Sequence, residues 1–497
     1  MFKNFPGYKL LEKIQKSNSH KRERKLPLNA IKLIFIVAIT SVIALLPTES
    51  FGIEGLTVVH QRIISLFVFA ALMWLTEAMP SWVTSMIVVT IMLLTVSTSA
   101  FNFLRPEDGA GLVPFKSIMA CFANPTIMLF IGGFVLAIGL TKVKLDVALA
   151  RVLLKPFGTR SEIVLLGFIL VTAIFSAFVS NTATAAMMLA FLTPVLKSLP
   201  ADGKGRIALA LAIPVGANLG GMITPIGTPP NMIALDYLSS QGMGISFVDW
   251  TIKMAPFVIL LLVLSWLLLR VLFPFKQKHI KIEIEGDIKW NRHTWSVVAA
   301  FAITIFMWMF GTDLWGVDTN VVAMIPIAIF CATGILTRRD LEEINWSVLW
   351  MVAGGFALGV ALNYKDASSV SLSSLIVNTV PFDNFSPLVV MILAGVICFG
   401  FSNFISHSAA TSLLVPVLGV VAGGLGSSLD SFGGPQAMLV GIAIASSVSM
   451  ILPISTPPNA IAHSTGFIEQ KDMMKVGIII GLMGLALGYA MLIFIGF

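Results

Sequence analysis

Apolar runs about 20 residues long recur along the whole chain, and they constrain its fold more than any other feature. A helix of about 20 residues spans the hydrocarbon core of a bilayer. Backbone groups in lipid must be satisfied within the protein, which a run of this length achieves as a helix. We therefore predict an all-α polytopic membrane protein with about eleven transmembrane helices. The runs fall near residues 30–47, 58–77, 82–99, 125–141, 207–238, 249–273, 295–313, 319–336, 346–362, 435–465 and 475–496.

The composition supports this prediction and excludes an ordinary soluble protein. Of the 497 residues, 57% are hydrophobic and only 11% are charged. The formal net charge is +7, but the basic residues cluster in short loops, which is typical of membrane orientation rather than nucleic-acid binding. We predict a multi-pass protein of the cell membrane with a cytoplasmic N-terminal segment, 1–29. Alternation then places four further basic groups on the same side: Lys142 to Arg160, Lys204 with Arg206, Lys276 to Lys281, and Arg338 with Arg339.

Two further apolar stretches, near 161–197 and 386–420, must enter and leave the membrane on one side if this alternation is to hold. Small polar residues interrupt each of them near its middle, so we predict two re-entrant helical hairpins. Non-helical backbone at membrane depth is tolerated where it is buried in protein or lines a cavity. Each hairpin tip is therefore expected to face a polar space. A short amphipathic stretch precedes each hairpin, near 142–157 and 365–379.

An internal repeat divides the chain into a first half, 30–275, and a second half, 294–497, joined by a cytoplasmic linker at 276–293. Gly-Gly-Phe ends at residue 134 and again at 356, an offset of 222 (356 − 134). Ser-x-Phe-x-Ser recurs at an offset of 226 (406 − 180), and Thr-Pro-Pro-Asn at 228 (459 − 231). Because the two hairpins open from opposite sides, the repeat is inverted. Inverted repeats with broken helices predict a secondary-transporter site near the membrane midplane.

Ser180-Asn181-Thr182 lies midway through the first hairpin. Hydroxyl and amide side chains compete for backbone partners there and end a helix. The N-terminus of the next helix then offers free N–H groups and a positive dipole end, which suit a carboxylate. The alternative is that these residues only cap or pack helices.

Prolines interrupt two of the long runs at matching places, Gly227-Thr228-Pro229-Pro230-Asn231 and Ser455-Thr456-Pro457-Pro458-Asn459. Proline removes an amide donor and breaks a helix, which frees carbonyl groups. Carbonyl, hydroxyl and amide oxygens are suitable ligands for Na⁺ beside an anion site. A structural proline kink remains the alternative for either motif alone.

These motifs resemble those of the divalent anion/sodium symporter family of di- and tricarboxylate carriers, over nearly the whole chain. The resemblance implies two re-entrant hairpins, a homodimer, an elevator-type motion and a dicarboxylate or citrate substrate. It also implies a first sodium site at Ser176, Ser180, Asn181 and Gly227. The predicted substrate-binding residues of the two halves are Ser180, Asn181, Thr182, Thr228 and Pro229, and Ser406, His407, Ser408, Thr456 and Pro457.

His407 departs from the sodium-coupled pattern, because it stands where the second half would repeat Asn181. Imidazole is a poorer Na⁺ ligand than oxygen, so a second cation site at Ser402, His407 and Ser455 is doubtful. A protonated imidazole could supply the positive charge in place of the cation. A carrier that keeps this charge after releasing its substrate must move an unpaired charge within the membrane, which is costly. This favours sodium-independent exchange of one C4 or C5 dicarboxylate for another.

Other functions remain open. Sodium-coupled symport of dicarboxylate or citrate is the main alternative, and an anion channel is a remote one. Sulfate is disfavoured only by the resemblance. No metalloprotease HExxH or hydrolase GxSxG motif occurs, so we predict no enzymatic activity and no cofactor, with Na⁺ as a candidate coupling ion. The three cysteines have neither disulfide nor metal-ligand spacing and are predicted to be packing residues.

Overall fold

The computed structural model describes residues 26–107, 109–200, 203–280, 290–366 and 370–497. Within these ranges the regular secondary structure consists of helices, and nine of them are long and apolar enough to cross a membrane. The prediction of an all-α polytopic membrane protein is therefore confirmed. Most of the N-terminal segment, 1–25, and most of the linker, 281–289, lie outside the described residues.

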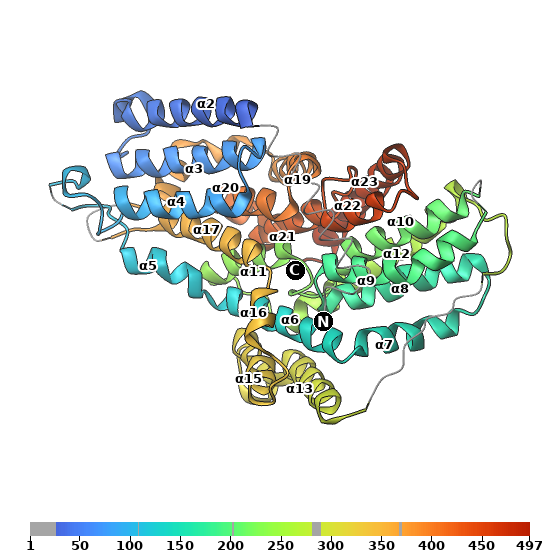
Figure 1. Cartoon of the computed structure of the whole chain (residues 1–497). Coiled ribbons are helices and arrows are strands. Elements are labelled where there is room, and N and C mark those ends of the chain that lie inside the picture. The colour runs from blue at the N-terminus through green and yellow to red at the C-terminus, as the bar shows by residue number, and fades with distance from the viewer. Residues whose placement is uncertain (1–25, 108, 201–202, 281–289, 367–369) are drawn as a thin grey trace.

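The first half runs from the helix at the edge of the molecule to the helix before the linker (Figure 1). Its helices are α2 (Leu26–Leu45), α3 (Val58–Thr76), α4 (Ser81–Thr95), α5 (Phe115–Ala120), α6 (Pro125–Lys142), α7 (Leu145–Leu154), α8 (Ser161–Phe178), α9 (Asn181–Ser198), α10 (Gly205–Gly220), α11 (Pro229–Ser240) and α12 (Phe247–Leu272).

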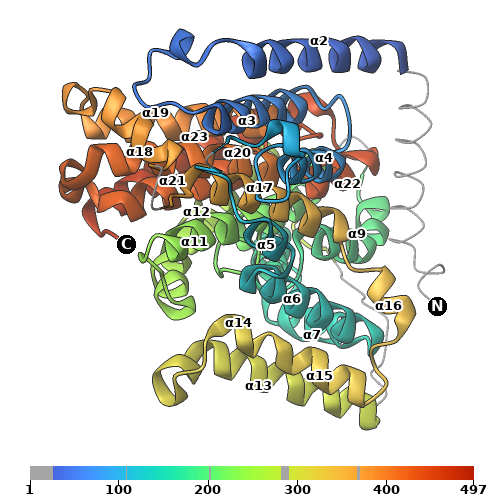
Figure 2. The same ribbon diagram turned by 90° about the vertical axis from the view of Figure 1, so that its left-hand side faces the viewer.

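The second half repeats this order from the helix after the linker. Its helices are α13 (Arg292–Trp315), α14 (Thr319–Val322), α15 (Met324–Ala332), α16 (Arg338–Glu342), α17 (Trp346–Asn363), α18 (Leu372–Thr379), α19 (Pro387–Phe404), α20 (His407–Leu425), α21 (Gly434–Ser447), α22 (Pro457–Ser464) and α23 (Gln470–Phe494). Helix α2 precedes the repeated set, lies along one edge of the molecule and packs on α3 (Figure 2).

The helices break where the sequence predicts. The run 207–238 forms two helices, α10 and α11, and the run 435–465 forms α21 and α22. The prolines of each motif occupy the first positions of the second helix, where a missing N–H costs nothing because no partner exists for it. Each predicted hairpin also consists of two helices in contact, α8 with α9 and α19 with α20. Whether these hairpins are re-entrant stays a prediction.

Two groups of helices can be distinguished by their packing. We call α2–α6 with α13–α17 the frame, because α4 packs on α17 and α6 packs on α15. We call α8–α12 with α19–α23 the core bundle, because α8 packs on α10, α11 on α21, and α10 on α22. The amphipathic helices α7 and α18 connect them: α7 contacts α6 and α8, and α18 contacts α17 and α20. The chain thus crosses between frame and core bundle once in each half through a short helix.

The repeated Gly-Gly-Phe motif marks close packing inside the frame. A Cβ on Gly132 of α6 would lie 2.5 Å from the carbonyl oxygen of Ala323, between α14 and α15. A Cβ on Gly354 of α17 would lie 2.4 Å from the Cβ of Ser85 on α4. In both copies the first glycine lets a helix from the other half approach closely. The second glycine of the first copy, Gly133, has open space instead.

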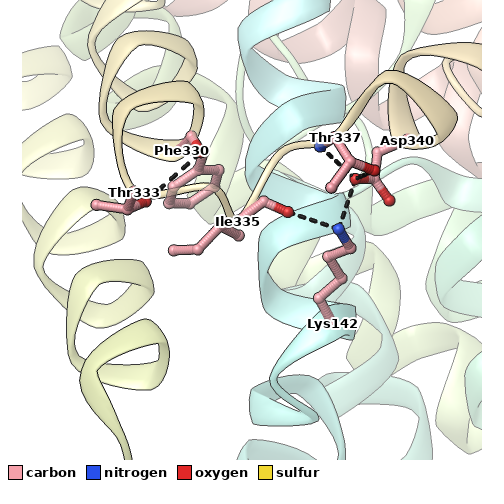
Figure 3. Close-up of polar contacts among 6 residues, drawn as sticks. All are labelled: Lys142, Phe330, Thr333, Ile335, Thr337 and Asp340. Atoms are coloured by element: carbon pink, nitrogen blue, oxygen red, sulfur yellow. Dashed lines mark hydrogen bonds and ion pairs between the residues drawn. The ribbon is translucent and has the colours of Figure 1, made fainter.

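Four of the segments that carry the predicted basic groups are joined in two pairs by hydrogen bonds. Lys142, at the end of α6, donates to the Asp340 carboxylate and to the carbonyl of Ile335, both at 2.5 Å (Figure 3). The same carboxylate accepts from the backbone N–H and the hydroxyl of Thr337. Burial alone would raise the pKa of Asp340, but the hydrogen bonds from Lys142 and Thr337 lower it below its usual value. This contact ties the segment between α15 and α17 to the end of α6.

A second pairing joins the segment before α8 to the segment after α12. The Ser161 N–H donates to the carbonyl of Lys278 at 3.0 Å, and the Ile280 N–H donates to Thr159 at 2.7 Å. Basic residues predicted to share one side of the membrane are therefore close in space. Which side that is stays a prediction. Of the cysteines, Cys121 and Cys398 are buried as predicted for packing residues, whereas Cys331 is exposed on the protein surface.

Candidate functional site

The breaks in the helices meet at one cavity of about 320 Å³. All ten predicted substrate-binding residues line it, five from each half of the chain. They come from the tips of the α8–α9 and α19–α20 hairpins and from the starts of α11 and α22. The structure thus brings these residues together, while their roles in binding stay predictions. The ten are Ser180, Asn181, Thr182, Thr228, Pro229, Ser406, His407, Ser408, Thr456 and Pro457.

Four helices begin at this cavity: α9, α11, α20 and α22. Ser180 caps α9 by accepting a hydrogen bond from the Ala183 N–H at 3.3 Å, and Ser406 caps α20 through Ala409 at 3.2 Å. The Thr456 hydroxyl accepts from the Asn459 N–H at 3.2 Å at the start of α22. Each helix start carries unpaired N–H groups and the positive end of the helix dipole. Two of these four helices belong to each half, so the positive ends of helix dipoles from both halves face the cavity.

The cavity lining contains one titratable side chain among the described residues, His407. Neither a lysine, an arginine nor a carboxylate belongs to that lining. Helix ends, hydroxyls and amides therefore supply the polar character of the site. Such a site can receive an anion without a fixed countercharge in the form of lysine or arginine.

Oxygen atoms gather around Asn181, the predicted first cation site. The Ser176 hydroxyl donates to the Ala217 carbonyl at 2.7 Å. With the amide oriented so that its partners are satisfied, the Asn181 nitrogen donates to the carbonyls of Gly227 at 3.0 Å and Ala217 at 3.3 Å, and to the Ser176 hydroxyl at 2.6 Å. In the opposite orientation the Asn181 oxygen would face these oxygens, an arrangement that requires a bound cation to stabilise it.

Ser176 itself lies behind the cavity wall and is fully buried. Gly227 belongs to the lining, and a Cβ there would lie 2.4 Å from the Gly221 carbonyl oxygen. Glycine is therefore required for the break to fold back so closely.

The second half builds a different arrangement around His407. Its Nε2 lies 2.5 Å from the carbonyl oxygen of Ser449 and must donate to it, because a carbonyl only accepts. A positive charge on the ring therefore requires a second proton, on Nδ1. Ser402 is buried behind the cavity and donates to Ser446, and Ser455 donates to the carbonyl of Leu452. The predicted second cation site thus has its imidazole engaged with backbone rather than with Ser402 or Ser455.

An asparagine outside the predicted set links the two halves at the site. Asn218, near the end of α10, donates from Nδ2 to the Thr456 hydroxyl at 3.2 Å and to the Asn459 side-chain oxygen at 3.0 Å. It is almost fully buried and lines the cavity. An amide inside the apolar run 207–238, outside the Pro-Pro-Asn motif, was the signal that could have identified it.

The motif asparagines close each break. Asn231 Nδ2 donates to the carbonyls of Gly221 at 3.1 Å and Thr224 at 2.9 Å. Asn459 Nδ2 donates to those of Met450 at 2.9 Å and Leu452 at 3.1 Å. The frame completes the cavity with Phe134 of the repeated Gly-Gly-Phe motif and with residues that carried no sequence signal, such as Trp82 and Asn345.

A second, larger cavity of about 1120 Å³ lies between the frame and the core bundle. It is lined by the starts of α6 and α14, the ends of α11 and α17, helix α18 and the middle of α20. It shares no lining residue with the first cavity.

An all-helical membrane protein in which broken helices from two repeated halves begin at one cavity has the architecture of a membrane transporter. A family model described as the sodium:sulfate symporter transmembrane region matches residues 28–496, and the chain belongs to that family. The protein is therefore a transporter and not an enzyme.

Individual relatives agree. An uncharacterized transporter of Haemophilus influenzae is 31% identical over 469 residues, covering 91% of this chain and 94% of that protein. A sodium-dependent dicarboxylate transporter, SdcS, of Staphylococcus saprophyticus is 28% identical, covering 85% and 83%. The crystal structure of the YdaH transporter of Alcanivorax borkumensis superposes with a TM-score of 0.53 at 12% identity, covering 86% of this chain and 97% of that one. That likeness supports the fold.

Proposed function

We propose that this protein carries small dicarboxylates across the cell membrane. The observation that carries the proposal is the convergence of four helix N-termini, two from each half, on one cavity without lysine or arginine. Two pairs of positive helix ends match a substrate with a carboxylate at each end. The name of SdcS, a sodium-dependent dicarboxylate transporter, supports the same substrate class.

The two cavities support transport by alternating access. Their frame walls are equivalent in the repeat: Gly133 and Phe134 line the first cavity, and Gly355 and Phe356, 222 residues later, line the second. Asn345 and Ser347 of the first cavity correspond at the same offset to Ala123 and Pro125 of the second. The core bundle therefore meets two similar frame surfaces, one on each side. A shift of the core bundle from one to the other, with α7 and α18 as connections, would expose the site alternately, as in an elevator.

Exchange of one dicarboxylate for another is our first proposal for the transport mode. His407 is the one titratable side chain among the described residues of the site, so it is the group that could carry a positive charge there. A core bundle carrying that charge returns more readily with a second dianion bound, because an unpaired charge is costly within the membrane.

Sodium-coupled symport is the second candidate. It is favoured by the Ser176 hydroxyl and the carbonyl oxygens of Ala217 and Gly227, which lie together beside Asn181, and by the name of SdcS. The proposals also include a homodimer in the bilayer and a cytoplasmic N-terminus. The orientation is supported by the clustering of the basic loops.

One experiment separates these modes. Purified protein in proteoliposomes is loaded with unlabelled succinate or left empty, and uptake of radiolabelled succinate is measured in sodium and in choline. Exchange predicts uptake only into loaded vesicles and in both salts. Robust uptake into empty vesicles driven by a sodium gradient would instead establish symport. His407→Asn, which restores the amide of the first half, is expected to increase the sodium dependence. Flux that does not saturate with substrate would indicate a channel.

A further inference from the structure

The second cavity contains a carboxylate with no role in the site described above. Asp236 lies on α11, seven residues after Pro229, and lines the cavity of about 1120 Å³. Its side-chain oxygen accepts a hydrogen bond from the hydroxyl of Thr126 at 2.9 Å. Asp236 is partly exposed, so the cavity gives it access to water and protons.

Asp236 has no ion pair with any described residue. Its helix belongs to the predicted span 207–238, where a charged side chain is costly and usually functional. Protonation removes that cost because it neutralises the carboxylate. A metal ion would require several further ligands, and no group of three or more His, Cys, Asp or Glu residues gathers in the described part of the chain.

The hydrogen bond joins the two groups of helices. Thr126 lies in the first turn of α6, a frame helix that packs mainly on α14 and α15. Asp236 belongs to the core bundle, where α11 packs on α20 and α21. An ionised carboxylate is a stronger acceptor than a neutral carboxyl group. Loss of the charge therefore weakens a direct link between frame and core bundle.

We propose that Asp236 is a proton-binding site that couples proton uptake from the second cavity to release of the core bundle from the frame. One proton from water in the cavity bonds to the carboxylate oxygen, and the neutral side chain then moves without a charge. This inference rests on the transport function proposed above and adds the proton as its coupling ion.

The other titratable groups that face this cavity come from several elements. They are Cys121 before α6, Tyr237 beside Asp236 on α11, Asp318 before α14, and Tyr364 with Lys365 after α17. Helix α20 contributes Ser412, Val415 and Pro416 to the lining, and α21 contributes none of the described lining residues. Asp318 is thus a second carboxylate on the same cavity, on the frame side, and offers a matched control.

The test compares full-length wild type with Asp236→Asn, Asp318→Asn and Thr126→Val in proteoliposomes. Exchange of fumarate is measured from about pH 6 to pH 9 with equal pH on both sides. Fumarate is chosen because its carboxyl groups are strong enough acids to stay ionised throughout. We expect wild-type exchange to slow about tenfold as the pH rises through the titration of Asp236.

Asp236→Asn is expected to abolish this pH dependence, whereas Asp318→Asn retains it. Thr126→Val keeps the carboxylate but removes the hydrogen bond from Thr126, so the pH dependence of the rate weakens. An Asp236→Asn variant with the wild-type pH profile would overturn the proposal.

An infrared difference spectrum of purified protein after a pH jump tests the site without relying on transport. All variants carry Asp146→Asn as a common background, because burial raises the pKa of Asp146 to about 6 and its carboxyl group would give a band of its own. The carboxylic-acid band is expected in this background and with Thr126→Val, and its loss is expected with Asp236→Asn. If wild type carries no fumarate but this background shows the band, the dicarboxylate function fails and the proton site stands. If the band persists in Asp236→Asn, the proton site fails whatever the substrate.

Discussion

At the scale of single residues, the two copies of the hairpin tip are equal in position and different in chemistry. Asn181 faces the carbonyls of Ala217 and Gly227, and His407 faces the carbonyl of Ser449. The sequence predicted both positions, because each stands at the same place in a repeated motif. It could not predict their carbonyl partners, which lie 36 or more residues further along the chain and meet the tips only through the packing of α10 and α21.

A buried carboxylate on the connecting helix α7 supplies a prediction at this scale. Asp146 is 7% exposed, and burial raises its pKa from 3.8 to about 6. A raised pKa means that the folded state binds the proton more tightly, so this group lowers stability as pH rises from about 4 to about 6. Two units correspond to about 3 kcal/mol. Asp146→Asn keeps an acceptor for the Val147 N–H.

We therefore expect Asp146→Asn to melt at a higher temperature than wild type above about pH 7 and at a similar temperature near pH 4. Thermal unfolding in detergent across this range measures the difference. Asp430→Asn, at an exposed position, is the control and should show no such trend. A stability difference for Asp146→Asn that does not vary with pH would contradict the assignment.

At the scale of elements, the helix boundaries followed from local chemistry. Serine is favoured at the N-cap of a helix and proline at its first position. The breaks before α9, α11, α20 and α22 were therefore predictable from the sequence. The contact between α6 and the junction of α14 and α15 was not predictable from the sequence. The Gly-Gly-Phe motif aligned the halves, but it did not reveal which glycine meets the facing helix.

The Gly132 contact can be tested with its neighbour as a control. Gly132→Ala places a methyl group 2.5 Å from the Ala323 carbonyl oxygen, so the frame must shift. We expect a loss of roughly 2 kcal/mol, as is usual for overpacking, seen as a lower melting temperature. Gly133→Ala points into open space and should leave the melting temperature unchanged. Equal changes in melting temperature for the two substitutions would show that helix propensity, rather than the contact with Ala323, determines the change.

At the scale of the whole molecule, the membrane class, the two halves and the meeting of both motifs at one site were predictable. Each follows from a repeated pattern in the chain. Asn218 and the second cavity were not predictable, because they depend on how the core bundle docks against the frame. That docking is set by many long-range contacts without a sequence signature of their own.

Docking of the core bundle on the frame leads to a prediction about movement. Gly355 of α17 and Ser412 of α20 face each other at the second cavity, where a Cβ on Gly355 would lie 3.0 Å from the Ser412 Cβ. In a background without native cysteines, Gly355→Cys with Ser412→Cys should cross-link under oxidation. Dicarboxylate exchange is expected to stop and to recover on reduction. Each single variant is the control, and unchanged exchange in the cross-linked protein would exclude movement between α17 and α20.

The hydrogen bonds that Asn231 and Asn459 donate to backbone carbonyls have a consequence for the thermodynamics of substrate binding. Each side-chain amide bonds to two carbonyls of its helix break, so these irregular segments are ordered before any substrate arrives. Fixing a free backbone residue costs about 1–2 kcal/mol of conformational entropy. Because these hydrogen bonds already fix the residues when the protein folds, the site is preorganised and substrate binding does not include that entropic cost. The irregular backbone at the centre of the molecule is thus a rigid receptor rather than a loop that orders around its substrate.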